Sequence, residues 1–177
     1  MNNIVYLATS IDGYIADRNG GIDWLNMVPN PSGDDLGWAE FLGRVDAVVM
    51  GRKTFEKVLS FGVDWPYPIP AFIVSTSMKE IPSGYGDKIE IIRGTPLEIT
   101  EDLNKKGYEN LYIDGGSTVQ QFLKEDLIDE LIITSIPIVL GGGIPLFNEL
   151  DKQLVFELVT TEVLLEQLVK TTYRRKR

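Results

Sequence analysis

Short apolar runs alternate with amphipathic stretches along most of the chain. Six of these runs predict buried strands, because each is short and is bounded by turn-forming residues. They cover residues 4–8, 47–50, 71–74, 89–92, 111–113 and 130–136. Residues 154–163 and 167–173 are rich in β-branched and aromatic side chains, which favours a closing antiparallel pair.

Helical spacing and capping residues predict the helices between these strands. The helix starts are expected at Asp34 or Asp35, at Thr54, at Thr95 and at Ser117. Gly107 is expected to end the third of these helices, and residues 141–143 are expected to form a glycine loop.

The alternation of strands and helices predicts an α/β fold. We expect three αβα layers around a mostly parallel mixed sheet, with the antiparallel pair at one edge. The chain has 177 residues and shows no linker, repeat or low-complexity tract. Residues 1–177 are therefore predicted to form a single domain.

Composition excludes several kinds of chemistry. The net charge is −9, which argues against a nucleic-acid partner. The chain contains neither cysteine nor histidine, so disulfides, Cys/His metal sites and Ser-His-Asp triads are excluded and no metal is expected. Neither a basic leader nor an apolar run of about 18 residues is present, so no membrane partner is expected and the predicted location is cytoplasmic.

The first strand end with binding potential is Gly51-Arg52-Lys53-Thr54. Glycine lets the backbone approach a ligand closely, a helix start favours anions, and Arg52 offers a forked donor that suits phosphate. An ordinary strand-to-helix turn with solvated cations explains the same residues. Spacing alone leaves both interpretations open.

Two further strand ends have a related composition. Ser75 and Thr76 follow one strand, where hydroxyls bind phosphate or simply form a turn. Gly115 and Gly116 follow another and precede a helix start, where a pyrophosphate can bind. Since ligands of open α/β sheets collect at the carboxyl ends of strands, the three ends together favour a nucleotide site.

Acid–base chemistry has one leading candidate. Asp35 lies at an expected helix start behind a long loop, where an aspartate is more often a cap than a catalytic acid. Gly13, Gly20 and Gly21 predict a mobile early loop that is a candidate lid.

The chain resembles the dihydrofolate-reductase-like superfamily, and within it the RibD C-terminal domain of riboflavin biosynthesis. Four segments in this order carry the resemblance over nearly the whole chain. They are residues 8–16 (ATSIDGYIA), 49–56 (VMGRKTFE), 113–117 (IDGGS) and 137–147 (PIVLGGGIPLF).

The resemblance implies a sheet of about eight strands and NADPH as the cofactor. By position it assigns Ala8 and Ile15 to the nicotinamide. It assigns the cofactor's phosphates to Gly51, Arg52, Lys53 and Thr54, the 2'-phosphate to Arg52, Ser75 and Thr76, and the pyrophosphate to Gly115, Gly116, Ser117 and Thr118. A homodimer is also expected from the family.

The substrate side of the resemblance is mixed. Asp35 and Thr134 fall where folate reductases carry their catalytic acid and its threonine partner. Residues 69–71 (IPA) replace the arginine that folate reductases use for the glutamate tail, and residues 24–35 lack the cations that riboflavin reductases use for a ribose phosphate. Residues 137–147 resemble the riboflavin branch.

The resemblance therefore implies a reductase similar to 5-amino-6-(5-phosphoribosylamino)uracil reductase. Hydride would pass to a C=N bond of a pyrimidine- or pterin-like substrate, with Asp35 or a nearby water supplying the proton. Two alternatives remain open: a dihydrofolate reductase, and an NADP-binding module without turnover.

Overall fold

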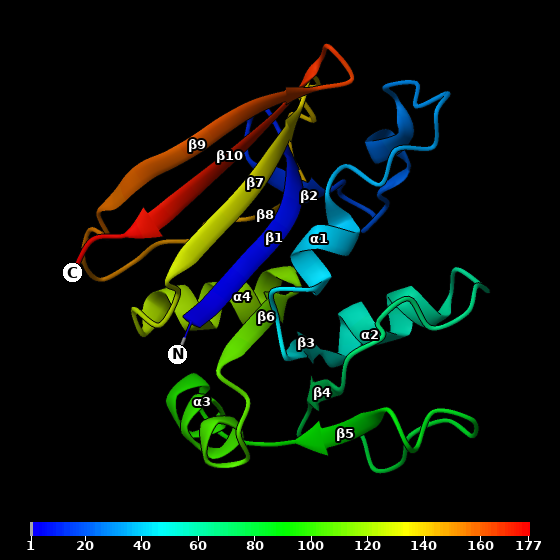
Figure 1. The fold of residues 1–177 in the computed structure, drawn as a ribbon, viewed down its shortest axis with the longest axis vertical. Helices are drawn as coiled ribbons and strands as arrows, with labels where there is room; N and C mark the ends of the chain where they lie inside the picture. Colours follow the sequence, from blue (N-terminus) through cyan, green and yellow to red (C-terminus); the bar gives the residue numbers. More distant parts are fainter. Residues whose placement is uncertain (1) are drawn as a thin grey trace.

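The computed structural model describes residues 2–177, and in that range eight strands form one sheet in the order β5-β4-β3-β6-β1-β7-β10-β9 (Figure 1). The strands are β1 (Asn2–Ser10), β3 (Ala47–Gly51), β4 (Ala71–Val74), β5 (Ile89–Ile92), β6 (Asn110–Asp114), β7 (Glu130–Ile136), β9 (Phe156–Leu164) and β10 (Leu168–Arg175). The first six strands in this order are parallel to their neighbours, and β10 runs antiparallel to both β7 and β9. The predicted mixed sheet with an antiparallel C-terminal edge is confirmed.

Helices cover the two faces of the parallel part in pairs. They are α1 (Trp38–Leu42) and α2 (Arg52–Leu59) on one face, and α3 (Pro96–Lys105) and α4 (Gly116–Lys124) on the other. Because neighbouring strand residues point to opposite faces, Val48 packs in the same core as Phe55 of α2, whereas Val49 packs with Phe122 of α4. The predicted three layers are therefore present.

Two short strands, β2 (Tyr14–Ala16) and β8 (Ile144–Pro145), form a second small sheet. The sequence pattern indicated only loops here. Gly143 has φ 155°, and a Cβ at this position would collide with the Ala16 carbonyl oxygen. Glycine therefore allows the two backbones to approach closely enough to pair. The pairing holds the loop after β1 against the segment that follows β7.

Three expected helix starts are wrong by one or more residues. Helix α1 begins at Trp38 with Gly37 as its N-cap, α2 begins at Arg52 and not at Thr54, and the N-cap of α4 is Gly115 and not Ser117. At two of these starts the strand runs almost directly into the helix, so no hydroxyl cap is needed. The expected start of α3 is confirmed, with a capping box between Thr95 and Glu98.

Strands β9 and β10 form one edge of the sheet and extend away from the four helices (Figure 1). None of the described helices combines the length and the apolar character that a membrane span requires.

Candidate active site

The carboxyl ends of β3 and β6 lie side by side, with Met50 paired to Asp114. From β3 the chain leaves through α2 toward β4, and from β6 it leaves through α4 toward β7, on the opposite face of the sheet. Neighbouring strands whose connections diverge form a topological switch point, where ligands of open α/β sheets bind. The N-termini of α2 and α4 both open at this point and favour an anion.

Close contacts bring six of the predicted cofactor residues together at this switch point. A Cβ on Gly115 would collide with the Thr54 hydroxyl, and a Cβ on Gly116 would lie 2.5 Å from Cδ1 of Ile15. A Cβ on Gly51 would lie 3.0 Å from Oγ1 of Thr118. A side chain at any of these positions would press against Thr54, Ile15 or Thr118, so the three glycines let the two strand–helix junctions pack closely, an arrangement we call the glycine cradle.

The first two positions of α2 are cationic, namely Arg52 and Lys53. Cations there oppose the helix macrodipole, so they do not stabilise the helix. Arg52 forms a 2.8 Å ion pair with Glu56, but both side chains are about half exposed, at 42% and 52%. Exposed pairs contribute little, so a bound anion can displace Glu56 from Arg52.

Ser75 follows β4 and lies beside this helix start, since Gly51 pairs with Val74. Its hydroxyl accepts hydrogen bonds from the backbone N–H groups of Met78 (2.9 Å) and Ser77 (3.3 Å), so part of its capacity stabilises a turn. Thr76 is exposed.

A further cation, Arg93, lies at this strand end and was not predicted from the sequence. Nε of Arg93, the residue that follows β5, donates to the Ser75 carbonyl oxygen at 3.3 Å. The missed signal was a cation directly after a strand, but only the β4–β5 pairing places it beside Ser75.

Ala8 and Thr134 lie opposite each other on the neighbouring strands β1 and β7, and Thr134 also lies opposite Lys170 of β10. Alternation along the strands places these side chains on the face that α1 covers, together with Tyr6. Thr134 is only 9% exposed. The structure thus places Ala8 and Thr134 on one face of the sheet, whereas Ile15 of β2 packs with the core on the other face.

Asp35 lies two residues before Gly37, the N-cap of α1. Its carboxylate accepts hydrogen bonds from the backbone N–H groups of Ala39 and Gly37, both at 2.9 Å. These bonds hold the pKa of the exposed Asp35 carboxyl below its usual value. Within residues 2–177 no hydrogen bond joins Asp35 to Thr134.

A second carboxyl, Asp114, lies at the carboxyl end of β6 on the same face as Tyr112. Its Oδ1 accepts from its neighbour Gly115 N–H at 2.7 Å, and its Oδ2 accepts from the Tyr67 hydroxyl at 3.1 Å. Burial raises the pKa of Asp114, and the bonds from Tyr67 and Gly115 act in the opposite direction. In the sequence Asp114 stands out only as part of the motif of residues 113–117, because burial and the distant Tyr67 donor leave no local pattern.

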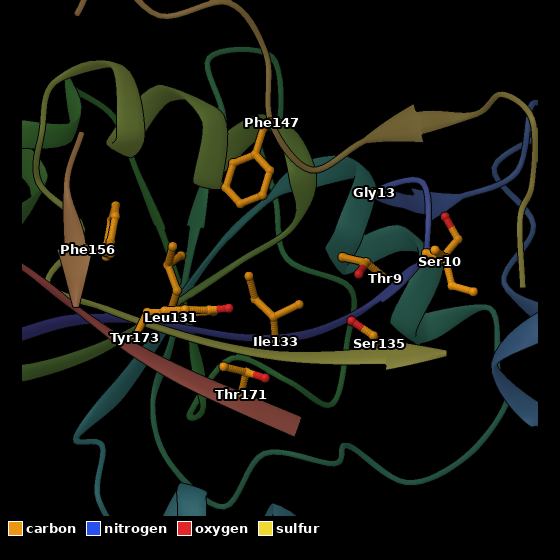
Figure 2. A pocket seen from close by; sticks show the side chains of 11 residues that line it. Thr9, Ser10, Gly13, Leu131, Ile133, Ser135, Phe147, Phe156, Thr171 and Tyr173 are labelled. Atoms are coloured by element: carbon orange, nitrogen blue, oxygen red, sulfur yellow. The ribbon is translucent and has the colours of Figure 1, made fainter. Parts of the chain in front are cut away.

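An open groove of about 410 Å³ lies on the other face of the sheet, over β7 and β10 (Figure 2). Its wall includes Leu131, Ile133, Phe147, Phe156 and Tyr173, and none of the residues that line it is charged. None of the predicted cofactor residues lines it either. The groove is therefore a separate surface from the switch point.

The strand order, the switch point and the glycine cradle define a dihydrofolate-reductase-like fold. The dihydrofolate reductase from Enterococcus faecalis, solved with NADP(H), superposes with a TM-score of 0.67 at 20% identity and covers 99% of this chain and 97% of that one. A deaminase/5-amino-6-(5-phosphoribosylamino)uracil reductase from Thermotoga maritima superposes with a TM-score of 0.76 at 15% identity, over 99% of this chain and 56% of that one. At these identities the likeness shows the fold alone.

Residues 3–170 match the RibD C-terminal domain, and the chain belongs to this family. A structure described as a putative riboflavin biosynthesis protein from Shewanella sp. PV-4 is 55% identical over all of both chains, with a TM-score of 0.97. The uncharacterized protein YwjB of Bacillus subtilis is 39% identical over 161 residues, which is 90% of each chain. The predicted resemblance is confirmed at the level of the family.

Proposed function

We propose that the chain, acting as a single domain of residues 1–177, is an NADPH-dependent reductase of a C=N bond in a pyrimidine- or pterin-like ring. The observation that carries the proposal is the glycine cradle between the starts of α2 and α4, at the carboxyl ends of β3 and β6. Ala8 and Thr134 lie on β1 and β7, the next two strands of the sheet. Membership of the RibD C-terminal domain family supports a substrate similar to 5-amino-6-(5-phosphoribosylamino)uracil.

Each part of the cradle has a role in this proposal. The N–H groups at the starts of α2 and α4 hold the pyrophosphate, with Ser117 and Thr118 beside it. Arg52, Lys53, Ser75 and Thr76 meet the 2'-phosphate side, where Arg93 adds a further cation. Ile15, held over Gly116, and Ala8 line the nicotinamide, which when bound supplies a hydride to the substrate carbon.

The nitrogen of the reduced bond must receive a proton, and two carboxyls can deliver it. Asp35, with Thr134 as its partner, is the sequence-based choice. Asp114 is favoured by its surroundings, because burial raises its pKa and keeps more of it protonated, whereas hydrogen bonds keep Asp35 ionised. We propose Asp114 as the proton donor and Asp35 as a charged group at the substrate face.

The test follows NADPH oxidation with 5-amino-6-(5-phosphoribosylamino)uracil and, separately, with dihydrofolate. Oxidation with the pyrimidine supports the proposal, and oxidation with dihydrofolate alone supports the folate-reductase alternative. Calorimetry with NADPH and NADH distinguishes the third possibility. Binding of NADPH without turnover of either compound would indicate a nucleotide-binding module, and no binding of either nucleotide would overturn both readings.

Asp114→Asn and Asp35→Asn separate the two proton sources. We expect Asp114→Asn to lower kcat by about 100-fold or more, which is typical for loss of a general acid. We expect a smaller loss for Asp35→Asn. The opposite ranking would return the acid role to Asp35.

We also propose that the protein is a homodimer, joined through the face of β7, β10 and β9 that carries the groove, whose lining residues are uncharged. On this face Leu158 of β9 lies opposite Tyr173, and Val163 of β9 lies opposite Val169. Leu158 is 62% exposed and Val163 is 66% exposed. The other face of the same strands carries ion pairs of Glu130 and of Lys170. Two copies with a net charge of −9 each can meet at the face that carries the groove without bringing like charges together.

Sedimentation equilibrium tests this contact. We expect a dimer for the natural protein and a monomer for Leu158→Glu, whereas Thr160→Glu, on the charged face of the same strand, should remain dimeric. A natural protein that is monomeric at micromolar concentration would contradict the proposal.

A further inference from the structure

Tyr67 lies in the irregular segment that precedes β4, far from the switch point in sequence. Its side chain is almost completely buried, with the residue 6% exposed, and its hydroxyl donates to Oδ2 of Asp114 at 3.1 Å. Tyr67 makes no contact that the nucleotide cradle requires. The hydrogen bond to Asp114 is therefore the feature that relates Tyr67 to the site.

We propose that Tyr67 is a positioning residue, which orients the Asp114 carboxyl and stabilises the carboxylate left when Asp114 gives up its proton. This inference rests on the proposed reductase function. In the step concerned, the O–H bond of Asp114 breaks and an N–H bond forms at the substrate nitrogen. The negative charge stays on Asp114, where hydrogen bonds to a charged oxygen become shorter and stronger.

Aromatic packing holds the Tyr67 hydroxyl in place. The centre of its ring lies 5.1 Å from that of Trp65, 6.0 Å from that of Trp38 and 6.4 Å from that of Tyr112. These neighbours come from three different parts of the chain, so the ring cannot swing away without breaking several contacts. A donor held in advance stabilises developing charge without paying for reorganisation.

The surroundings of Asp114 make this donor important. Within residues 2–177 Asp114 forms no ion pair, and its carboxyl is approached by Gly115 N–H, by the Tyr67 hydroxyl and by Tyr112. The Tyr112 hydroxyl donates to the Tyr6 carbonyl oxygen at 3.0 Å. With no ion pair, the ionised form of Asp114 depends on the Tyr67 hydroxyl and the Gly115 N–H group.

A purely structural reading exists, because buried tyrosines usually donate a hydrogen bond somewhere. The two readings differ in what they predict for Asp114. A structural role changes the stability of the fold. A positioning role changes the pH at which the Asp114 carboxyl loses its proton.

The experiment measures that pH by carbon-13 NMR of labelled aspartate carboxyls in the protein without ligands, with Asp114→Asn identifying the signal. We expect Tyr67→Phe to raise the pKa of Asp114 by about one pH unit, because a hydrogen bond to the ionised form is lost. Tyr85→Phe is the matched control, since Tyr85 also packs against Trp65, with ring centres 5.9 Å apart. An Asp114 titration that is the same in Tyr67→Phe and the natural protein would overturn the proposal.

A second measurement needs no substitution and covers the case in which Tyr67→Phe does not fold. In the natural protein the Tyr67 ring signals should shift with the same midpoint as the Asp114 carboxyl, and independent behaviour would also overturn the inference. The kinetic arm uses 5-amino-6-(5-phosphoribosylamino)uracil and NADPH. If Asp114→Asn keeps full turnover, Asp114 is not the proton donor and the proposed mechanism fails. If Asp114→Asn loses turnover but the pH profile of turnover is unchanged in Tyr67→Phe, only the inference about Tyr67 fails.

Discussion

Gly115 lies so close to Thr54 that a Cβ at position 115 would collide with the Thr54 hydroxyl. The two residues belong to different strand–helix junctions, and their contact closes the cradle between α2 and α4. Gly115 also has φ 86°, a conformation that residues with a side chain rarely adopt.

We expect Gly115→Ala to lower the stability of the fold by about 1–3 kcal/mol and to weaken NADPH binding at least tenfold. Thermal unfolding and calorimetry measure the two effects. Gly107→Ala is the control, because Gly107 has φ 94° with nothing within 4 Å of its Cβ position. If both variants lose stability equally and bind NADPH normally, the collision at Gly115 has no role in the site.

Arg52 is expected to bind the 2'-phosphate of NADPH. Arg52→Ala should weaken NADPH binding roughly tenfold or more and leave NADH binding almost unchanged, since only NADPH carries that phosphate. Arg93→Ala tests the second cation at this strand end in the same way. Lys57→Ala, near the other end of α2, serves as the control. An equal loss for both nucleotides would show that Arg52 binds the shared pyrophosphate or stabilises the fold.

Asp12 ties the loop after β1 to the segment after β7. Its carboxylate accepts hydrogen bonds from the N–H groups of Gly141 (2.8 Å) and Leu140 (3.0 Å), and Arg18 donates to the Gly141 carbonyl at 2.8 Å. We expect Asp12→Ala to increase hydrogen exchange at residues 14–16 and to weaken NADPH binding, because Ile15 loses its support over Gly116. Asp23→Ala, at an exposed position of the short 3-10 helix Asp23–Asn26, should leave exchange in β2 unchanged. Unaltered exchange in Asp12→Ala would contradict the expected coupling.

Acid should weaken the clamp on the C-terminal strand. Asp126 pairs with Arg175 through two contacts, at 2.7 Å and 3.0 Å, and the hydrogen bonds from Arg175 lower the pKa of Asp126 from 3.8 to about 2. Because the folded-state pKa is the lower one, the stabilisation is complete well above pH 3.8 and is lost as the pH falls through about 2.

In urea unfolding near neutral pH, the free energy of unfolding of Asp126→Asn should be lower than that of the natural protein by on the order of 1 kcal/mol, after allowance for solvent screening. The difference from the natural protein should shrink toward about pH 2. Asp102→Asn, which breaks the exposed ion pair with Lys105, should lower the free energy of unfolding much less. A loss that does not change with pH would rule out ionisation of Asp126 as the cause.

Local patterns determined most of the fold. The mainly apolar runs at 71–74, 89–92 and 130–136 match the observed strands, because strands covered by helices bury apolar side chains. Thr95, Pro96 and Gly107 placed α3 correctly, since capping depends on neighbouring residues. The family motifs also indicated which strand ends to examine, and the structure brings Gly51, Thr54 and Gly115 together there.

Only the tertiary structure decided the electrostatics of the candidate site. Asp35 lies two residues before a glycine and Asp114 directly before one, but backbone donors lower the pKa of Asp35 and burial raises that of Asp114. Tyr67 reaches Asp114 across 47 residues, and Arg93 reaches Ser75 through strand pairing. Burial and long-range hydrogen bonds arise when distant segments pack together, so a linear pattern carries no record of them.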